Sequence, residues 1–224
     1  RPGEVSLAHH GVLFLDELPE FSPQTLDALR QPLETGECVI ARANHRISYP
    51  ARIQLVAAMN PCRCGMAGEP GYRCARGERC RTDYQARISG PLLDRIDLRI
   101  EVPAVSASDL IRPGQAESSA TVAARVAQAR EIQRERFERL GSAVTCNAQC
   151  PTAMIETIAA PDAAGLALLG DASAKLGFSA RAYHRVLKVA RTLADLDGSD
   201  SVGRIHVAEA ISYRMAADRQ AQAA

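Results

Sequence analysis

Two short, largely apolar runs stand out in the first hundred positions of the chain. They are "VLFL" at 12–15 and the longer "IQLVAAMN" at 53–60. Short runs of this kind, without polar alternation, are typical of strands that a parallel sheet buries on both faces. A further apolar segment, "LRIEVP" at 98–103, predicts a third strand that ends at its proline.

The segment between the first two runs has a helical pattern. Ser22 suits an N-cap, Pro23 the first turn, and Gly36 the end of a helix. Apolar residues recur at helical spacing, at Leu26, Leu29 and Leu33. Pro32 is expected to bend or shorten the final turn, because it lacks the N–H that a helix interior needs.

The second half of the chain changes character. A linker-like stretch follows residue 103, and almost continuous helical patterns come after it. The first of these helices has Ser118 or Ser119 as its cap and Gly141 at its end. We therefore predict an α/β fold followed by an all-α part. The expected divisions are an α/β domain over 1–103, a linker over 104–118 and a helical domain over 119–224.

Composition narrows the function classes only a little. The 224 residues are 46% hydrophobic and 24% charged, with a formal net charge of +1, which is ordinary for a globular protein. No apolar run approaches the roughly 20 residues that cross a bilayer, so we expect no membrane partner and a cytoplasmic location. Seven cysteines without a secretion signal favour metal binding or free thiols over disulfides.

The first apolar run leads directly into two acids, Asp16 and Glu17. In an open α/β sheet, ligands bind at the carboxyl ends of the strands. A strand that ends in Asp-Glu suits nucleotide hydrolysis, because the Asp can orient hydrated Mg²⁺ and the Glu can polarise the attacking water. Two acids before a helix are also favoured by the helix dipole alone, so the residues by themselves leave both interpretations open.

Four ordered motifs extend this pattern along the chain. "GVLFLDE", "AAMNP", "LLDRIDL" and "SARAYHRVLKVA" together resemble the AAA+ superfamily, and more closely its magnesium-chelatase-like branch and the ComM-type competence proteins within it. The resemblance covers most of the α/β part and, more loosely, the helical part. It implies a partial P-loop-type parallel sheet core followed by a C-terminal helical lid.

The resemblance also implies a role for five residues. Asp16 and Glu17 match the Walker B acids, and Asn60 matches the sensor that positions the hydrolytic water. Arg95 matches an arginine finger, and Arg181 matches the sensor arginine of the lid. The implied cofactors are ATP and Mg²⁺, and the implied assembly is a hexameric ring.

Each of the last three residues also has an ordinary structural interpretation. Asn60 precedes a proline and fits a turn. Arg95 can pair with Asp94 or Asp97, which flank it. Arg181 and the arginine one turn on can form a solvated basic face of a helix.

One part of a nucleotide motor is missing from the printed sequence. The phosphate-binding pattern GxxxxGK[ST] does not occur, and neither lysine, Lys175 or Lys188, follows a glycine. In the family this loop precedes the Walker B strand. We therefore expect a fragment that neither binds ATP tightly nor hydrolyses it alone, and that self-associates through exposed sheet edges.

Four cysteines fall within nineteen residues after the second run. Cys62, Cys64, Cys74 and Cys80 lie on a glycine-rich segment that is too polar to fold by burial. Four thiols suit a tetrahedral structural Zn²⁺ site. The C-x-C and C-x₅-C spacings depart from the usual C-x-x-C pattern, so reduced thiols on a loop remain the alternative.

The segment "ECVIARANHRISY" at 37–49 predicts a β-hairpin. Its tip carries Arg42, Asn44, His45 and Arg46, and it resembles the pre-sensor hairpin that faces the pore in ring-shaped relatives. Basic residues there suit contacts with a DNA backbone, although no aromatic residue is present for base stacking. A solvated hairpin end is the alternative.

Three function classes follow from these patterns. The leading hypothesis is a ComM-type ATPase that remodels DNA or migrates its branches. The second is the ATPase subunit of a chelatase that inserts Mg²⁺ into a porphyrin. The third is a non-catalytic interaction module.

Overall fold

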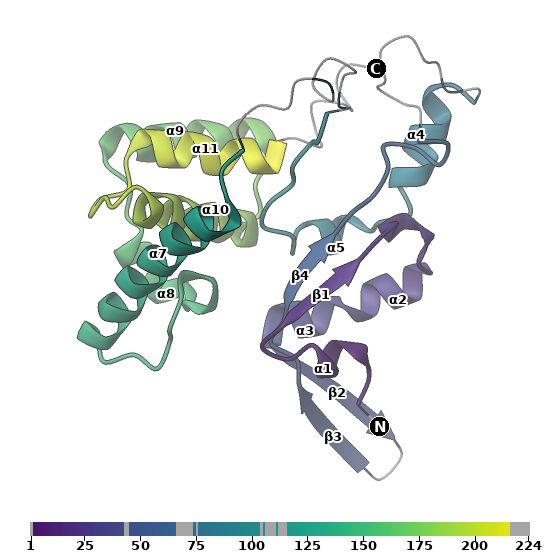
Figure 1. Cartoon of the computed structure of the whole chain (residues 1–224), viewed down its shortest axis with the longest axis horizontal. Coiled ribbons are helices and arrows are strands. Elements are labelled where there is room, and N and C mark those ends of the chain that lie inside the picture. The colour runs from purple at the N-terminus through teal and green to yellow at the C-terminus, as the bar shows by residue number, and fades with distance from the viewer. Residues whose placement is uncertain are drawn as a thin grey trace. The chain divides into compact units, whose positions relative to one another are not determined.

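The computed structural model describes residues 2–42, 45–65, 74, 76–103, 105, 111 and 116–215. The chain divides into two compact units, Arg1–Ile96 and Asp97–Ala224. The first unit is mixed α/β and the second is helical (Figure 1). This agrees with the predicted order of an α/β part followed by an all-α part.

The first unit is built on one pair of parallel strands. Strand β1 (Val12–Leu15) pairs with β4 (Gln54–Ala57) from Val12 opposite Gln54 to Leu15 opposite Ala57. Both strands lie inside the predicted apolar runs, so those two predictions are confirmed. Strands β2 (Glu37–Arg42) and β3 (His45–Pro50) form the predicted hairpin as a separate antiparallel sheet. Figure 1 shows the hairpin extending away from the parallel pair.

The described part of the first unit also contains six short helical segments. They are α1 (Glu4–Leu7), the 3₁₀ turn η1 (Leu18–Glu20), α2 (Pro23–Ala28), α3 (Arg30–Thr35), α4 (Glu78–Gln85) and α5 (Gly90–Leu93). Leu13 and Leu15 pack against an apolar cluster formed by Leu18, Leu26, Leu29, Ile88 and Leu92. On the other face, Val12 and Phe14 are 57% and 59% exposed. The prediction that β1 is buried on both faces was therefore wrong for the described part of the chain.

The predicted helix over 22–36 is two helices. Its ends are as expected, since Ser22 Oγ accepts from Thr25 N at 3.2 Å and Gly36 closes α3 with a φ of 72°. The break lies at Leu29, between α2 and α3, rather than in the final turn. Pro32 explains the position, because it cannot donate to the carbonyl four residues earlier and its ring crowds that carbonyl.

The second unit contains a 3₁₀ turn and five helices within residues 116–215. They are α7 (Ser119–Arg139), η2 (Asn147–Gln149), α8 (Thr152–Ile158), α9 (Ala163–Leu176), α10 (Ala180–Leu196) and α11 (Arg204–Met215). Ser118 caps α7 through its hydroxyl, which accepts from Thr121 N at 3.1 Å, and Gly141 follows its end with a φ of 64°. The short helix α8 was not predicted.

The predicted strand over 98–103 was wrong. Leu98, Ile100 and Val102 are exposed, and the segment has no strand assignment. The backbone N–H of Arg99 donates to the carbonyl of Tyr213 in α11, at 3.0 Å, rather than to a neighbouring strand. An apolar sequence becomes a strand only where a partner supplies the other half of the ladder.

Helix α10 forms the centre of the second unit and packs against α7, α8 and α11. Its apolar face joins a core that includes Val186, Leu187 and Ala190. The same helix carries a fully buried carboxylate, Asp195, which forms ion pairs with Arg136 and Arg191. No helix in the described ranges combines the length and the apolarity that crossing a membrane requires.

The buried carboxylate of Asp195 gives a stability prediction. We expect Asp195→Ala to lower the free energy of unfolding by about 3–5 kcal/mol, because the fully buried guanidinium of Arg191 would lose its compensating charge. Urea unfolding followed by circular dichroism measures the loss. As a control, Glu131→Ala removes a solvent-exposed partner of Arg134 and should leave the midpoint unchanged. Equal losses in the two variants would contradict the assignment.

Candidate functional site at the carboxyl edge of the parallel strands

The predicted acid pair lies at the edge where both parallel strands end. The chain continues to pair beyond the strands, because Ala58 N–H donates to the Leu15 carbonyl at 2.9 Å. Asp16 and Glu17 therefore lie beside the segment that leads to Asn60. All three polar side chains are exposed, so the structure brings the acid pair and the amide to one accessible edge.

Glu17 has an unusual backbone conformation. Its φ of 50° and ψ of 47° lie in the left-handed region, which costs a residue other than glycine about 1 kcal/mol or more. Neighbouring hydrogen bonds hold it there: Glu17 N–H donates to Asp16 Oδ1 at 2.9 Å, and Leu18 N–H donates to the Ala58 carbonyl at 3.0 Å. The left-handed turn ends β1 sharply and starts η1, which leaves both carboxylates exposed at the edge.

The donor set fits Mg²⁺. Carboxylate oxygens are hard ligands, and Mg²⁺ is usually held by one or two of them while it keeps several waters. Asp16 Oδ1 accepts from the Glu17 backbone N–H, and the second carboxylate oxygen can accept from the water shell of an ion. The exposed edge leaves room for the remaining ligands to come from water and phosphate.

Sequence reasoning missed Tyr84, which α4 brings to this edge. Its side chain is buried, and burial raises the pKa of its phenol, with further increases from the negative charges of Glu20 and Glu17. A second contact ties the same region together, since Arg87 Nη1 lies 3.2 Å from Glu20 Oε2. Tyr84 has no recognisable motif around it, so only the fold reveals its nearness to the acids.

Arg95 lies just after α5 and has local partners. Its Nε is 3.1 Å from Glu34 Oε2, and its Nη1 donates to the Pro91 carbonyl at 2.7 Å. The side chain is 11% exposed. The sequence suggested Asp94 or Asp97 as its ordinary partner, whereas the ion pair is made with Glu34, a residue of α3.

The ion pair holds the Arg95 guanidinium toward the end of the sheet where β1 and β4 begin, opposite to the acid pair. Glu34 lies two residues before Gly36, whose carbonyl accepts from Ala51 N at 2.7 Å, shortly before β4 begins. Gly36 also contacts this region closely, since a Cβ there would lie 2.8 Å from the Arg52 side chain. A four-residue strand spans about 13 Å. The structure therefore does not bring Arg95 to the acid pair of its own unit.

Arg181 belongs to the second unit, in the first turn of α10. Ser179 caps this helix, since its Oγ accepts from Ala182 N at 3.1 Å, as the sequence predicted. Arg181 is exposed, but Arg185 is only 16% exposed and forms an ion pair with Asp97. The two arginines therefore do not form one solvated basic face.

The hairpin tip is described in part. Arg42 and His45 are paired backbone to backbone at the end of β2 and β3, and Arg46 is exposed on β3. Asn44 lies outside the described residues. The contact with DNA predicted for these four residues stays a prediction.

The four predicted cysteine ligands come together. The sulfur atoms of Cys62, Cys64, Cys74 and Cys80 all lie within 4.8 Å of one another. Two of the separations are 3.1 Å, between Cys62 and Cys64, and 3.2 Å, between Cys64 and Cys74. The hydrogen bond with Cys64 raises the pKa of Cys74 to about 12. The arrangement is that of a thiol cluster, with Cys62 and Cys80 buried.

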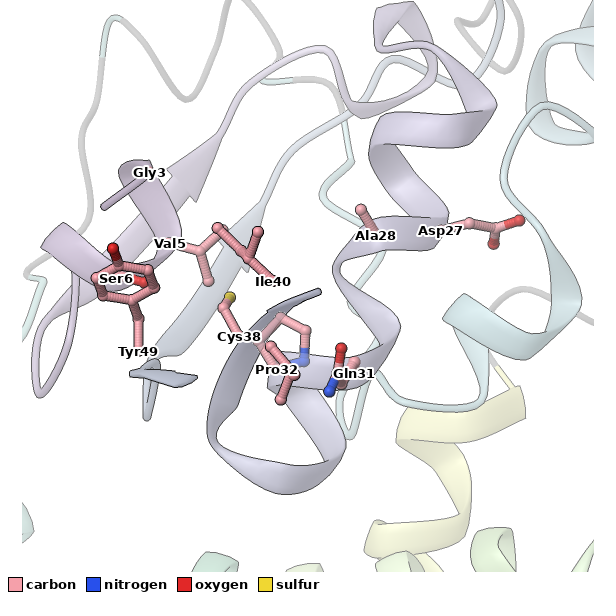
Figure 2. A pocket seen from close by; sticks show the side chains of 11 residues that line it. Gly3, Val5, Ser6, Asp27, Ala28, Gln31, Pro32, Cys38, Ile40 and Tyr49 are labelled. Carbon is pink, nitrogen blue, oxygen red and sulfur yellow. The ribbon is translucent and has the colours of Figure 1, made fainter. Parts of the chain in front are cut away.

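A separate groove of about 410 Å³ lies between α1, α2, α3 and the hairpin (Figure 2). Val5, Cys38 and Ile40 point into it. Asp27 borders the groove, but its carboxylate points away and accepts from Ser89 Oγ at 2.7 Å. The groove includes neither the acid pair nor the thiol cluster, so the strand edge remains the candidate site.

Comparison with known families agrees with this geometry. The family model described as magnesium chelatase, subunit ChlI, matches residues 1–110, and the model for the C-terminal part of that subunit matches residues 116–214. The chain belongs to the magnesium-chelatase family. The resemblance inferred from the sequence motifs is thereby confirmed, while the role of each site residue stays a prediction.

Individual relatives refine the placement within this family. The chain is 48% identical over 215 residues to the competence protein ComM of Haemophilus influenzae and 48% identical over 216 residues to the uncharacterized protein YifB of Escherichia coli. These alignments cover 96% and 95% of the chain but 41% of each relative. The magnesium-chelatase 38 kDa subunit of Cereibacter sphaeroides is 24% identical over 97% of the chain and 58% of that subunit. The chain thus spans about two fifths of the length of ComM and YifB.

The left-handed conformation of Glu17 can be tested directly. We expect Glu17→Gly to be more stable than Glu17→Ala by about 1 kcal/mol, because glycine adopts a positive φ without the Cβ penalty that alanine keeps. Chemical denaturation of the two variants, compared with wild type, measures this difference. Equal stabilities would contradict the backbone assignment. The comparison does not depend on any catalytic role, since both variants lack the carboxylate.

Proposed function

We propose that the chain supplies the hydrolytic edge of an ATPase. The observation that carries this proposal is the parallel pairing of β1 with β4. Because both strands end on the same side, the exposed residues that follow them, Asp16, Glu17 and Asn60, share one edge. Ligand sites in open α/β sheets form where such strands end. Membership of the magnesium-chelatase family supports the same chemistry.

The proposed roles follow from the functional groups. The Asp16 carboxylate would hold Mg²⁺ through its hydration shell, and the ion would supply positive charge against the phosphates of ATP. The Glu17 carboxylate accepts a hydrogen bond from the attacking water and polarises it toward phosphorus. The Asn60 amide can donate to a γ-phosphate oxygen and accept from the same water, which fixes the line of attack.

Arg95 is proposed to serve the site of a neighbouring copy. Its ion pair with Glu34, on the side of the sheet where β4 begins, supports this proposal, because it directs the guanidinium away from the acids of its own unit. A guanidinium supplied by a neighbour can stabilise charge on the transferred phosphoryl group. We assign Arg181, exposed at the start of α10, to the nucleotide as the sensor of a helical lid. A hexameric ring is the proposed assembly.

The first test measures ATP hydrolysis by a protein that contains this chain and matches the full length of ComM and YifB. We expect Glu17→Gln and Arg95→Ala each to lower kcat by at least 10²-fold, because each removes a group that acts on the transition state. If Arg95 acts on a neighbour, mixing the two inactive variants should restore part of the activity, since some interfaces then combine an intact Glu17 with an intact Arg95. Arg134→Ala, on an exposed face of α7, is the matched control.

Two outcomes would count against this assignment. Full activity in Glu17→Gln would remove the acid pair from the mechanism. Mixtures that stay as inactive as their components, while still assembling, would place Arg95 and Glu17 in the same site and contradict the proposed sharing.

DNA is the proposed partner, and remodelling or branch migration is the proposed work. The similarity to a competence protein supports this, as does the exposed Arg46 on a projecting hairpin. The second candidate is the ATPase subunit of a metal-inserting chelatase, which the family model and the more distant chelatase relative support. The higher identity to the competence protein favours the first.

A stimulation experiment separates the candidates. We expect branched DNA to raise the ATPase rate of the full-length protein several-fold, with a smaller response in Arg46→Ala, because a phosphate contact is lost. A porphyrin-loading partner should have no effect. Stimulation by that partner alone would favour the chelatase, and the absence of any ATP hydrolysis would favour a non-catalytic interaction module.

A further inference from the structure

The thiol cluster connects two elements of the candidate site. Cys62 lies two residues after Asn60, on the chain that leaves β4, and Cys80 lies in the first turn of α4. Cys64 and Cys74 complete the cluster between them. The cluster thus joins the chain that follows Asn60 to the start of α4.

The geometry of the cluster matches one tetrahedral ion. Zn²⁺ binds thiolate sulfur at about 2.3 Å, so four tetrahedral sulfurs lie about 3.8 Å apart. The observed sulfurs include separations of 3.1 Å and 3.2 Å, and none exceeds 4.8 Å. Shifts of about 1 Å or less bring all four to the ideal distance. Thiolate ligands in tetrahedral geometry favour Zn²⁺ over the harder divalent ions.

Nearby charge favours the same assignment. A Zn²⁺ ion with four thiolates carries a formal charge of −2, which needs compensation. Arginines flank the ligands closely in sequence: Arg63 separates the first two cysteines, Arg76 follows Cys74 by two positions, and Arg79 and Arg81 flank Cys80. Positively charged side chains this near in sequence can offset the charge of the bound complex.

We propose that Cys62, Cys64, Cys74 and Cys80 bind one Zn²⁺ and that this ion positions the backbone around Asn60 relative to α4. The metal would act as a positioning element and would not touch the substrate. The importance of this positioning for function rests on the proposed ATPase activity, whereas metal binding itself does not depend on it.

Side chains of α4 connect the cluster to the acid edge and to the chain beside Asn60. Gln85 Nε2, near the end of α4, donates to the Pro61 carbonyl at 3.2 Å, one residue after Asn60. Tyr84 on the same helix is 5% exposed, and burial together with the negative charges of Glu20 and Glu17 raises the pKa of its phenol. If the ion is removed, Cys80 no longer anchors the start of α4, and both contacts lose their support.

The first measurement is metal content in protein purified without a histidine tag. We expect one equivalent of zinc per chain, and replacement by Co²⁺ should give the visible absorption of tetrahedral thiolate coordination. Cys64→Ser and Cys74→Ser should lose the metal. Cys38→Ser is the matched control, because Cys38 is a half-buried cysteine on β2 outside the cluster. Less than about half an equivalent of zinc, without a cobalt spectrum, would overturn the site.

The second measurement tests whether the ion positions the backbone. It uses wild-type protein, so that misfolding of a variant cannot obscure the result. Amide hydrogen exchange is compared before chelation, after it, and after zinc is restored. We expect exchange at 58–62 and 82–86 to rise at least tenfold on chelation and to recover with zinc, while the β2–β3 hairpin stays unchanged. If the protein binds zinc but exchange at 58–62 stays unchanged when chelation removes it, the proposed positioning role is overturned.

The two proposals fail in different ways. If the cluster binds zinc and orders the edge but the full-length protein does not hydrolyse ATP, the ATPase assignment falls and the metal site stands. If ATP is hydrolysed with the same kcat after zinc is stripped, the metal has no positioning role and the ATPase assignment stands.

Discussion

The pairing of β1 with β4 is the interaction on which the first unit depends. Its register, with Leu15 opposite Ala57, determines which backbone atoms lie next to Asp16 and Glu17. A shift by one residue would turn Leu13 and Leu15 away from the apolar cluster and expose them. The same burial that stabilises the unit therefore fixes the acids at the edge, so the position of the site is a consequence of the core.

This dependence explains why a strained residue is retained at the edge. Glu17 keeps a left-handed backbone because Asp16 Oδ1 accepts its N–H and Ala58 holds the next residue. An extended conformation there would continue the direction of β1 instead of turning the chain into η1. The local cost is offset by the hydrogen bonds that surround it, and the result is a sharp turn at the edge of the sheet.

Local chemistry made several elements predictable, and remote partners made others unpredictable. Ser22, Ser118 and Ser179 cap helices through bonds that span three residues, so the sequence indicated all three, with Ser119 as the alternative to Ser118. The apolar run at 98–103 was misread because strand formation depends on a partner that the segment does not contain. The ion pair of Arg95 with Glu34 was missed for the same reason, since it joins residues far apart in sequence.

The distribution of charge over the first unit bears on the symmetry of assembly. The acids lie at the carboxyl edge of the strands, and Arg95 is held toward the amino edge. In a two-fold dimer residue i of one copy contacts residue j of the other and the reverse, so the unlike edges could meet only in an antiparallel contact that closes at two copies. A head-to-tail arrangement repeats one contact between unlike edges, and it closes as a ring when the rotation permits. The proposed ring is this head-to-tail arrangement, in which every interface would pair the acid edge of one copy with Arg95 of the next.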